Sequence, residues 1–314
     1  MSYESEIKTR IGIDLGGSHI KAGEVDTAGN IIRRHTEPTE SRCDYNTIIQ
    51  QVTRIIKELQ RQSVNHIELV GFGTAGLMSQ DNQKVLFAPN LDGLNNKFIV
   101  QDLSDLCGLD VLMDNDANCM ALGEGLAGAA RGMTHYIAIT LGTGVGGAII
   151  SNGTLIRGWK GGGGEIGHVP INLTGPQCDC GSQGCLEAFI GINGIKNHIT
   201  NNYPSMGSTS IKQVHSLASN GNEEARAVFA WIGQTLAFGL AGLVNIFNPK
   251  MIVIGGGIAT ARDFLFVPLK SKLAELALAI YYADMIVCEA ELGTWAGVVG
   301  AANLDNLDPV AHRR

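Results

Sequence analysis

The chain has 314 residues and a formal net charge of -7, from 23 lysines and arginines against 30 aspartates and glutamates. This length favours two domains, because a single hydrophobic core seldom grows beyond about 250–300 residues. The acidic balance and the lack of a basic run in the sequence exclude a nucleic-acid surface, which needs clustered Lys and Arg. We therefore expect no nucleic-acid partner.

The N-terminal segment MSYESEIKTR leads directly into an apolar strand, without the charged and then apolar pattern of a secretory leader. No stretch approaches the roughly 18 uninterrupted apolar residues of a membrane span. Three of the seven cysteines crowd into CDCGSQGC at 178–185, a spacing that favours metal binding over a disulfide framework. We expect a cytoplasmic protein with no membrane partner.

The first half of the chain shows strands at 9–15 and 18–25, separated by Gly16 and Gly17, and a shorter apolar segment at Ile31 and Ile32. Helical apolar spacing over 45–62 is followed by a strand at 67–71. This order predicts a β-meander with a glycine-rich first turn, then a helix and a further strand.

The opening recurs in the second half, where strands at 136–141 and 146–150 flank the turn Gly142–Gly144. Long helical patterns follow at 223–247 and near 293–304, with a strand at 251–254 between them. Two related α/β units are the natural interpretation.

The spacing G-x-G-x-x-G occurs at 71–76 and at 142–147, which would suggest a dinucleotide-binding dehydrogenase. Such a fingerprint must open a helix, whereas the first copy leads into the polar segment LMSQDNQ and the second into the strand AII. No phosphate-binding loop of the form G-x-x-x-x-G-K-[ST] is present in the sequence. We expect two tight β-turns whose backbone N–H groups bind a phosphate chain, with Asp14 beside a metal ion.

DLGGSHIK at 14–21 and LGTGVGG at 141–147 resemble the two phosphate motifs of the superfamily of sugar kinases, actin and heat-shock chaperones. APNLDG at 88–93, NDAN at 115–118, GEIGH at 164–168 and CDCGSQGCLE at 178–187 resemble, more narrowly, the ROK family of sugar kinases and transcriptional repressors. The resemblance runs from about Ile11 to Ala302. GWKGGGGE at 158–165 is more glycine-rich than the family pattern, which leaves the identity of the sugar open.

The resemblance implies a two-lobed, actin-like ATPase fold of the ribonuclease H-like α/β class, with the active site in the interlobe cleft. We expect residues 1–118 to form an N-terminal lobe that a C-terminal helix over 297–314 completes. A larger C-terminal lobe over 119–296 then carries a zinc-binding loop. We also expect a homodimer or higher homo-oligomer.

ATP and Mg²⁺ are the implied cofactors, with Asp14 beside the magnesium. A third glycine segment follows the strand at 251–254 and could approach adenosine closely, or could be a simple strand-to-helix turn. The residues expected to bind the nucleotide are Asp14, Gly16, Gly17, Ser18, Lys21, Gly142, Thr143, Gly144, Gly255, Gly256, Gly257 and Ile258.

Asp116 is the candidate catalytic residue, because a sugar hydroxyl is a poor nucleophile and needs a carboxylate to accept its proton. The family resemblance places the general base on this aspartate. The structural alternative is that Asn115, Asp116 and Asn118 form an Asx turn that caps a helix beginning near Ala117.

His168, Cys178, Cys180 and Cys185 supply one imidazole and three thiolates within a short segment, a set that suits a closed tetrahedral zinc. Chance clustering of buried cysteines is the alternative. A structural zinc would hold the loop that presents sugar-binding residues, and the resemblance gives His168 both roles. The residues expected to bind substrate are Thr74, Asn90, Asn115, Asp116, Glu165, His168 and Glu187.

The predicted function is ATP-dependent phosphorylation of a hexose, glucose to glucose 6-phosphate first. Allose, mannose, fructose, N-acetylmannosamine and N-acetylglucosamine are alternative substrates. A sugar-responsive repressor and a sugar-binding regulator without turnover are the rival classes. The repressor needs a DNA-binding module, for which we find no sequence signal.

Overall fold

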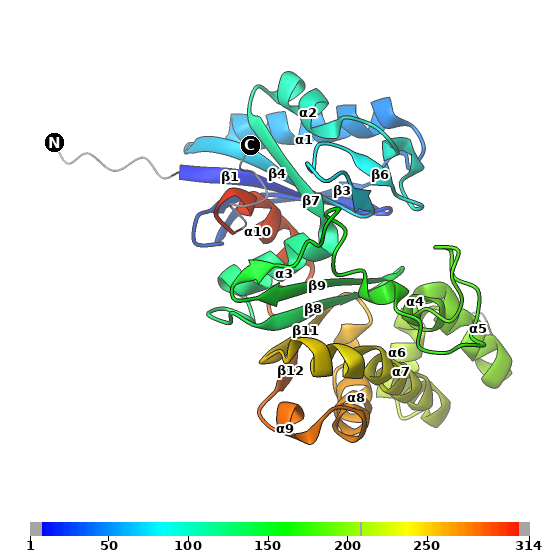
Figure 1. Cartoon of the computed structure of the whole chain (residues 1–314). Coiled ribbons are helices and arrows are strands. Elements are labelled where there is room, and N and C mark those ends of the chain that lie inside the picture. Colours follow the sequence, from blue (N-terminus) through cyan, green and yellow to red (C-terminus); the bar gives the residue numbers. More distant parts are fainter. Residues whose placement is uncertain (1–7, 208, 308–314) are drawn as a thin grey trace. The chain divides into compact units, whose positions relative to one another are not determined.

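The computed structural model describes residues 8–207 and 209–307, with side chains up to residue 305 (Figure 1). The chain divides into two compact units. The first comprises residues 1–132, 154–163 and 291–314, and the second comprises residues 133–153 and 164–290. The lobe limits that we predict at residues 118 and 296 stay a prediction, and the part of the predicted C-terminal helix at 308–314 lies outside the described residues.

The first unit contains a five-stranded sheet of order β3-β2-β1-β4-β7. β1 pairs antiparallel with β2 and parallel with β4, and β4 pairs parallel with β7. Its strands are β1 (Lys8–Leu15), β2 (His19–Asp26), β3 (Ile31–Pro38), β4 (His66–Thr74) and β7 (Asp110–Asn115). The segment after Gly76, which we expected to be a loop, contributes β5 (Leu77–Met78), and this strand pairs with β6 (Val85–Phe87). The separate segment 154–163 of this unit begins with β10 (Thr154–Leu155).

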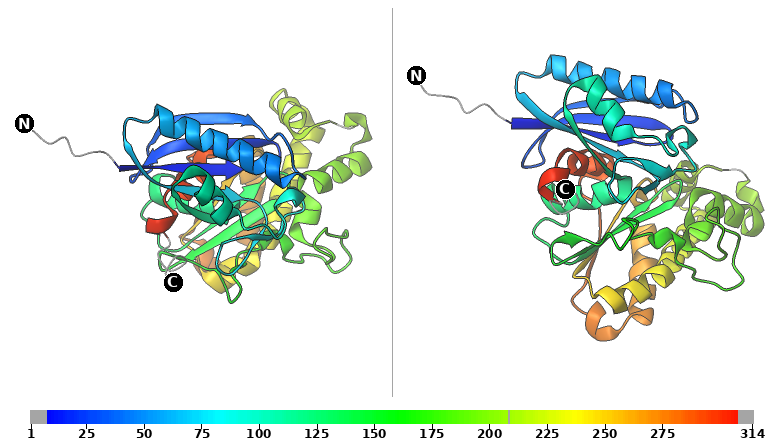
Figure 2. Two further views of the ribbon diagram at one scale, coloured as in Figure 1. Left: turned by 90° about the horizontal axis from the view of Figure 1, so that it is seen from above. Right: turned by 45° about the horizontal axis from the view of Figure 1, so that its top comes forward.

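Helices cover both faces of this sheet, α1 and α2 on one and α3 and α10 on the other (Figure 2). The described helices of this unit are α1 (Tyr45–Gln62), α2 (Ile99–Cys107), α3 (Asp116–Ala127), α10 (Ala296–Ala302) and α11 (Leu304–Leu307). Asp44 caps α1 by accepting hydrogen bonds from the backbone of Asn46 and Thr47. The apolar stripe of α1 is buried, as amphipathic spacing requires.

α10 lies unusually close to the sheet. A Cβ at Gly71 of β4 would stand 1.7 Å from the carbonyl oxygen of Ala301, so only glycine admits the helix backbone there. This helix, from near the end of the chain, therefore packs on the first sheet, and its first turn lies next to Asp14.

The second unit repeats the same strand pattern. β8 pairs antiparallel with β9 and parallel with β11, which pairs parallel with β12. The order β9-β8-β11-β12 matches β2-β1-β4-β7 of the first unit, so the internal repeat that we predicted is present. The strands are β8 (Tyr136–Leu141), β9 (Val145–Ser151), β11 (Met251–Gly255) and β12 (Ile286–Glu289).

α7 forms the helical core of the second unit together with α8 (Figure 1). It is the one described helix long and apolar enough to cross a membrane by length and composition, but 61% of its most apolar window is buried inside the protein, as in a core helix. The helices of this unit are α4 (Leu186–Ile190), α5 (Ile192–Asn202), α6 (Ile211–Ser219), α7 (Glu223–Phe247), α8 (Asp263–Leu276) and α9 (Ala279–Tyr282).

Candidate active site

The carboxyl ends of three neighbouring parallel strands meet at one edge of the first sheet. Leu15 at the end of β1 is in register with Thr74 at the end of β4, and Thr74 is in register with Asn115 at the end of β7. Residues that follow these positions therefore lie side by side, which is where open α/β sheets place their ligand sites. Asp14 and Asp116, far apart in the sequence, belong to this edge.

The first glycine turn connects β1 to β2. The backbone N–H of Gly16 donates to the carbonyl of His19 at 3.0 Å, which closes the turn. Thr39 braces it from outside, since its backbone N–H donates to the carbonyl of Ser18 at 3.0 Å and its hydroxyl donates to the carbonyl of Gly16 at 2.7 Å. Three hydrogen bonds thus hold the conformation of this turn.

Asp14 precedes this turn. Burial raises its pKa, and Lys21, whose Nζ lies 3.7 Å from Oδ2, partly offsets that effect. A Cβ at Gly297, in the first turn of α10, would stand 3.1 Å from the Asp14 carboxyl carbon. The carboxyl group therefore lies between β2 and α10, where a bound cation would favour its ionised form.

Thr74 and Asn90 lie beside the same turn. Thr74 is fully buried and its hydroxyl donates to the carbonyl of Leu15 at 3.4 Å. The Asn90 carbonyl oxygen is 3.4 Å from the position of a Cβ at Gly17, and Asn90 itself is exposed. Thr74 thus supports the end of β1, whereas Asn90 borders the turn from the solvent side.

Asn115 caps α3, as the structural alternative predicted. Its Oδ1 accepts hydrogen bonds from the backbone N–H groups of Ala117 at 2.9 Å and Asn118 at 3.3 Å, and its Nδ2 donates to the carbonyl of Gly76 at 3.1 Å. Asp116 is the first residue of the helix, and its Oδ1 also accepts from Ala117 at 2.9 Å. The cap therefore does not compete with a catalytic Asp116, because it fixes the backbone that carries this side chain.

The second glycine turn connects β8 to β9 in the second unit. The N–H of Gly142 donates to the carbonyl of Gly144 at 3.0 Å, and Leu141 pairs with Val145 across the turn. The carboxylate of Glu187 accepts a hydrogen bond from the N–H of Val145 at 2.8 Å. This turn is the structural counterpart of the first.

The third glycine segment follows β11 and lies against the second turn. The N–H of Ile258 donates to the carbonyl of Leu141 at 3.3 Å. Gly256 has φ +90°, and a Cβ there would stand 2.2 Å from the carbonyl oxygen of Leu141. Gly256 is therefore required by both its conformation and the close approach of β8.

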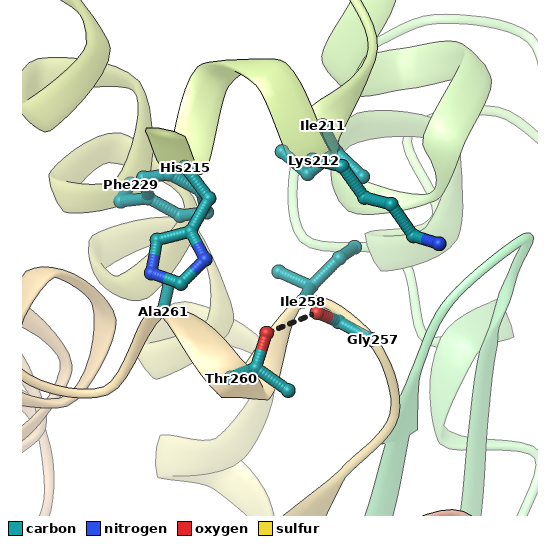
Figure 3. A pocket seen from close by; sticks show the side chains of 8 residues that line it. All are labelled: Ile211, Lys212, His215, Phe229, Gly257, Ile258, Thr260 and Ala261. Carbon is teal, nitrogen blue, oxygen red and sulfur yellow. Dashed lines mark hydrogen bonds between the residues drawn. The ribbon is translucent and has the colours of Figure 1, made fainter. Parts of the chain in front are cut away.

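A small pocket of about 80 Å³ opens beside this segment (Figure 3). α6 contributes a lysine and a histidine, and Thr260 donates its hydroxyl to the carbonyl of Gly257 at 2.8 Å. The lining combines apolar surface with polar groups, but the volume is well below the roughly 300–1,000 Å³ of a small-molecule site, so the pocket would take only one part of a ligand. The pocket is lined by Ile211, Lys212, His215, Phe229, Gly257, Ile258, Thr260 and Ala261.

The predicted metal residues converge in the second unit. The ligand atoms of His168, Cys178, Cys180 and Cys185 all lie within 4.8 Å of one another. Cys178 Sγ is 3.6 Å from His168 Nδ1, and Cys180 Sγ is 3.7 Å from Cys185 Sγ. A tetrahedral zinc with Zn–S bonds of about 2.3 Å would hold sulfur atoms about 3.8 Å apart, so these distances fit the metal and are too long for a disulfide.

Glu165 lies at the start of the short helical turn that carries His168, Ile166–His168. Burial raises the pKa of Glu165, the neighbouring His168 lowers it, and Glu187 raises it further. The carboxyl groups of Glu165 and Glu187 and the imidazole of His168 thus act electrostatically on one another, and His168 also belongs to the cysteine cluster. Such a group offers both acceptors and a donor for sugar hydroxyls.

The sequence and the structure of this chain are both similar to those of known proteins. The model of the ROK family matches residues 10–306. The glucokinase of Thermotoga maritima is 33% identical over 94% of this chain and 96% of its own length, and that of Halalkalibacterium halodurans is 35% identical over 92% of each. The chain belongs to the ROK family. A ROK glucokinase of Streptomyces griseus, solved with glucose and AMPPNP, has the same fold with a TM-score of 0.84 and 31% identity, over 94% of this chain and 98% of that one.

ROK membership confirms the resemblance inferred from the motifs, and the mixed α/β, actin-like fold is confirmed with it. In this ROK chain, the first unit holds Asp14, the first turn, Thr74, Asn90 and the Asn115–Asp116 pair. The second unit holds the other two glycine segments, Glu165, Glu187 and the cysteine cluster. The roles of the individual residues stay predictions.

The sequence reasoning missed two features of this ROK chain. The pocket residues Lys212 and His215 lie on α6, whose short and partly polar pattern we did not assign. Arg157 forms an ion pair with Asp114, immediately before the Asn115–Asp116 pair. The available signal was an arginine directly before the glycine-rich segment GWKGGGG at 158–164.

Proposed function

We propose that this protein is an ATP-dependent sugar kinase that phosphorylates a hexose hydroxyl, with glucose as the first candidate and glucose 6-phosphate as its product. The related glucokinases and the S. griseus structure with glucose and AMPPNP support this reaction. The observation that carries it is the register of β1, β4 and β7, which places Asp14 and Asp116 at one sheet edge beside a braced glycine turn.

Asp116 acts as the general base in this proposal. Its backbone is held by the α3 cap, and its carboxylate accepts the proton of the attacking hydroxyl. Thr74, Asn90 and Asn115 border the same edge, and Glu165, His168 and Glu187 bind the remaining sugar hydroxyls. Positioning of the hydroxyl in line with the γ-phosphoryl supplies most of the catalysis.

The two glycine turns bind the ATP phosphates through backbone N–H groups, with Ser18 and Thr143 adding hydroxyls and Lys21 a positive charge. Asp14 would hold Mg²⁺, which neutralises phosphate charge when it is bound. Adenosine lies along Gly255–Ile258, and the pocket beside this segment offers it Lys212 and Thr260.

Zinc would bind His168, Cys178, Cys180 and Cys185, whose donor types and spacing fit a closed structural site. These four ligands fill all four coordination positions of a tetrahedral zinc, so none is left for substrate. The zinc therefore supports the loop that carries Glu165 and does not act as the catalyst. We further propose a cytoplasmic location, where ATP is available, and a homo-oligomeric state.

A coupled assay that follows ADP formation with a panel of hexoses tests the function. We expect turnover with glucose above that with mannose, allose, fructose, N-acetylglucosamine and N-acetylmannosamine, and NMR of the product then identifies the phosphorylated hydroxyl. A larger kcat/KM for another sugar would replace glucose. Sugar binding by calorimetry without turnover of any sugar would overturn the kinase and favour a sugar-binding regulator.

A further inference from the structure

Asp114 is a buried carboxylate in the first unit, one residue before the α3 cap. Its side chain is only 1% exposed, and Arg157 pairs with it through both terminal nitrogens, Nη1 at 3.3 Å from Oδ1 and Nη2 against Oδ2. A charge buried this deeply is costly unless a partner and further hydrogen bonds compensate it. Arg157 is that partner, and its fork matches the carboxylate geometry.

The same carboxylate organises the turn that carries Asp116. Asp114 Oδ1 accepts hydrogen bonds from the backbone N–H of Asn115 at 2.7 Å and from Asn118 Nδ2 at 2.9 Å. Asn115 and Asn118 flank Asp116 in the sequence. The position of Asp114 therefore sets the position of both sides of the turn.

Arg157 also belongs to a tight loop of its own. Gly163 donates its N–H to the carbonyl of Arg157 at 2.8 Å, and Gly158 between them has φ +66°. Gly161 packs on the backbone of Gln80, with 3.5 Å between its Cβ position and the Gln80 Cα. The ion pair thus joins this glycine loop to the Asn115–Asp116 turn within one unit.

The charges around Cys119 point to the same arrangement. Burial raises the pKa of this thiol well above its usual range, and Asp114, Asp14 and Asp116 raise it further, whereas Arg157 lowers it. Asp114, Asp14 and Asp116 therefore all act electrostatically on this buried thiol, and Arg157 acts on it with the opposite sign.

We propose that Arg157 is a positioning residue for the phosphoryl-transfer reaction, which holds Asp114 and, through it, the turn that presents Asp116. The glycine loop 158–163 then has a definite role, because its hydrogen-bonded conformation holds the Arg157 side chain against Asp114 of β7. This inference rests on the proposed kinase function, and it adds to that function a residue outside the motifs that identified the family.

The experiment compares Arg157→Met with Arg157→Lys, and uses Arg33→Met as the matched control. Arg33 pairs with Glu24, a fully buried carboxylate of the same sheet, at a place that the proposed function does not use. We expect Arg157→Met to lower kcat by about 100-fold, as small displacements of catalytic groups do, with the KM for ATP little changed. Arg157→Lys should recover part of the loss, and Arg33→Met should lower the melting temperature but keep kcat.

The double variant Arg157→Met with Asp114→Asn separates positioning from stability. It removes the uncompensated buried charge, so we expect the melting temperature to recover while kcat stays low. Recovery of kcat together with stability would overturn the positioning role, as would an unchanged kcat in Arg157→Met. Where Arg157→Met does not fold, the kcat values of Arg157→Lys and of the double variant test the positioning role. A kcat equal to that of wild type in either variant would overturn it.

Hydrogen exchange gives a readout that does not need activity. We expect faster amide exchange in Arg157→Lys confined to peptides that cover 110–120 and 154–163, whereas exchange unchanged there, or faster throughout the chain, would overturn the inference. Wild-type protein that phosphorylates no sugar would refute the proposed kinase and, with it, the catalytic consequence. The exchange result would then still decide whether Arg157 holds the turn.

Discussion

Glu187 accepts a hydrogen bond from the backbone N–H of Val145 at 2.8 Å, which joins the first turn of α4 to the residue after the second glycine turn. The N–H of Ile192, at the start of α5, donates to the carbonyl of Thr143 at 3.1 Å. The helices that follow the cysteine cluster therefore hold the turn that we propose for phosphate binding. Glu187 thus connects the helix that follows the cysteine cluster to this turn.

Gly144→Ala should disrupt this connection. A Cβ there would stand 2.1 Å from the Glu187 carboxylate oxygen, so the carboxylate must move and leave the Val145 N–H without its acceptor. A lost hydrogen bond of this kind costs about 1–3 kcal/mol. We expect a lower melting temperature and an increase in the KM for ATP of about tenfold, measured by thermal denaturation and steady-state kinetics.

Gly242→Ala is the matched control, because a Cβ at this exposed position of α7 meets no atom within 4 Å. It should keep the KM for ATP and leave the protein at least as stable, since alanine favours a helix over glycine by about 1 kcal/mol. An unchanged KM for ATP in Gly144→Ala would show that the Glu187 contact is not needed for nucleotide binding.

Acid should destabilise the protein in part through Glu24, which is fully buried on β2. Burial alone would raise its pKa, but hydrogen bonds outweigh burial and hold the pKa below its ordinary value of 4.5. The stability from these bonds is therefore present above about pH 4.5 and is lost as the pH falls through the lower, folded-state value. The donors to Glu24 are Asn65, Ser63, Arg33 and Thr9.

Glu24→Gln removes this titration. We expect it to lower stability at neutral pH by about 1–3 kcal/mol, and to make the decline of the melting temperature below about pH 4.5 shallower. Glu223→Gln, whose parent carboxylate is 87% exposed, should follow the wild-type profile. If the melting temperatures of wild type and Glu24→Gln fell in parallel with decreasing pH, Glu24 would not contribute to the acid sensitivity of the fold.

Strongly patterned elements were predictable from the sequence. The predicted helices over 45–62 and 223–247 coincide with α1 and α7, since a continuous apolar face over many turns has no competing interpretation. β3 extends to Pro38, although only Ile31 and Ile32 signalled it. Its later residues alternate between partly buried and exposed and are polar, so the strand is defined by pairing with β2, which the local sequence does not show.

The candidate site was predictable where its residues are close in sequence. The segments that contain the cysteines and NDAN are short motifs, so their geometry follows from local chain turns. Arg157 and Asp114 are 43 residues apart and share no motif, and their pairing depends on how β7 and the glycine loop pack. Long-range ion pairs of this kind need the tertiary structure.

Zinc removal should affect sugar binding before it affects chemistry. We expect metal analysis of the purified protein to give close to one zinc per chain, and Cys180→Ser to lose most of it, because a three-ligand remnant binds zinc weakly. The KM for the sugar should rise by about tenfold or more, with a smaller fall in kcat. Cys43→Ser, an exposed cysteine outside the cluster, is the control and should keep both zinc and activity. Metal-free wild-type protein with full activity would refute the site.

Asp116→Asn tests the general base most directly. The amide keeps the size of the side chain and can still accept the hydrogen bond from the Ala117 N–H, so the α3 cap and the fold should survive. It cannot accept a proton from a sugar hydroxyl, and loss of general-base catalysis costs about 100- to 10,000-fold in rate. We expect kcat to fall by that amount while the Kd for the sugar, measured by calorimetry, stays within about threefold of wild type.

Asp105→Asn provides the matched comparison, because it makes the same change at an exposed residue of α2 that the proposed function does not use. It should keep kcat close to that of wild type. If Asp116→Asn retained turnover close to wild type, the base would have to be another group. Loss of sugar binding together with turnover would instead assign Asp116 to substrate binding, because a base that acts only in the transition state lowers kcat without weakening the ground-state complex.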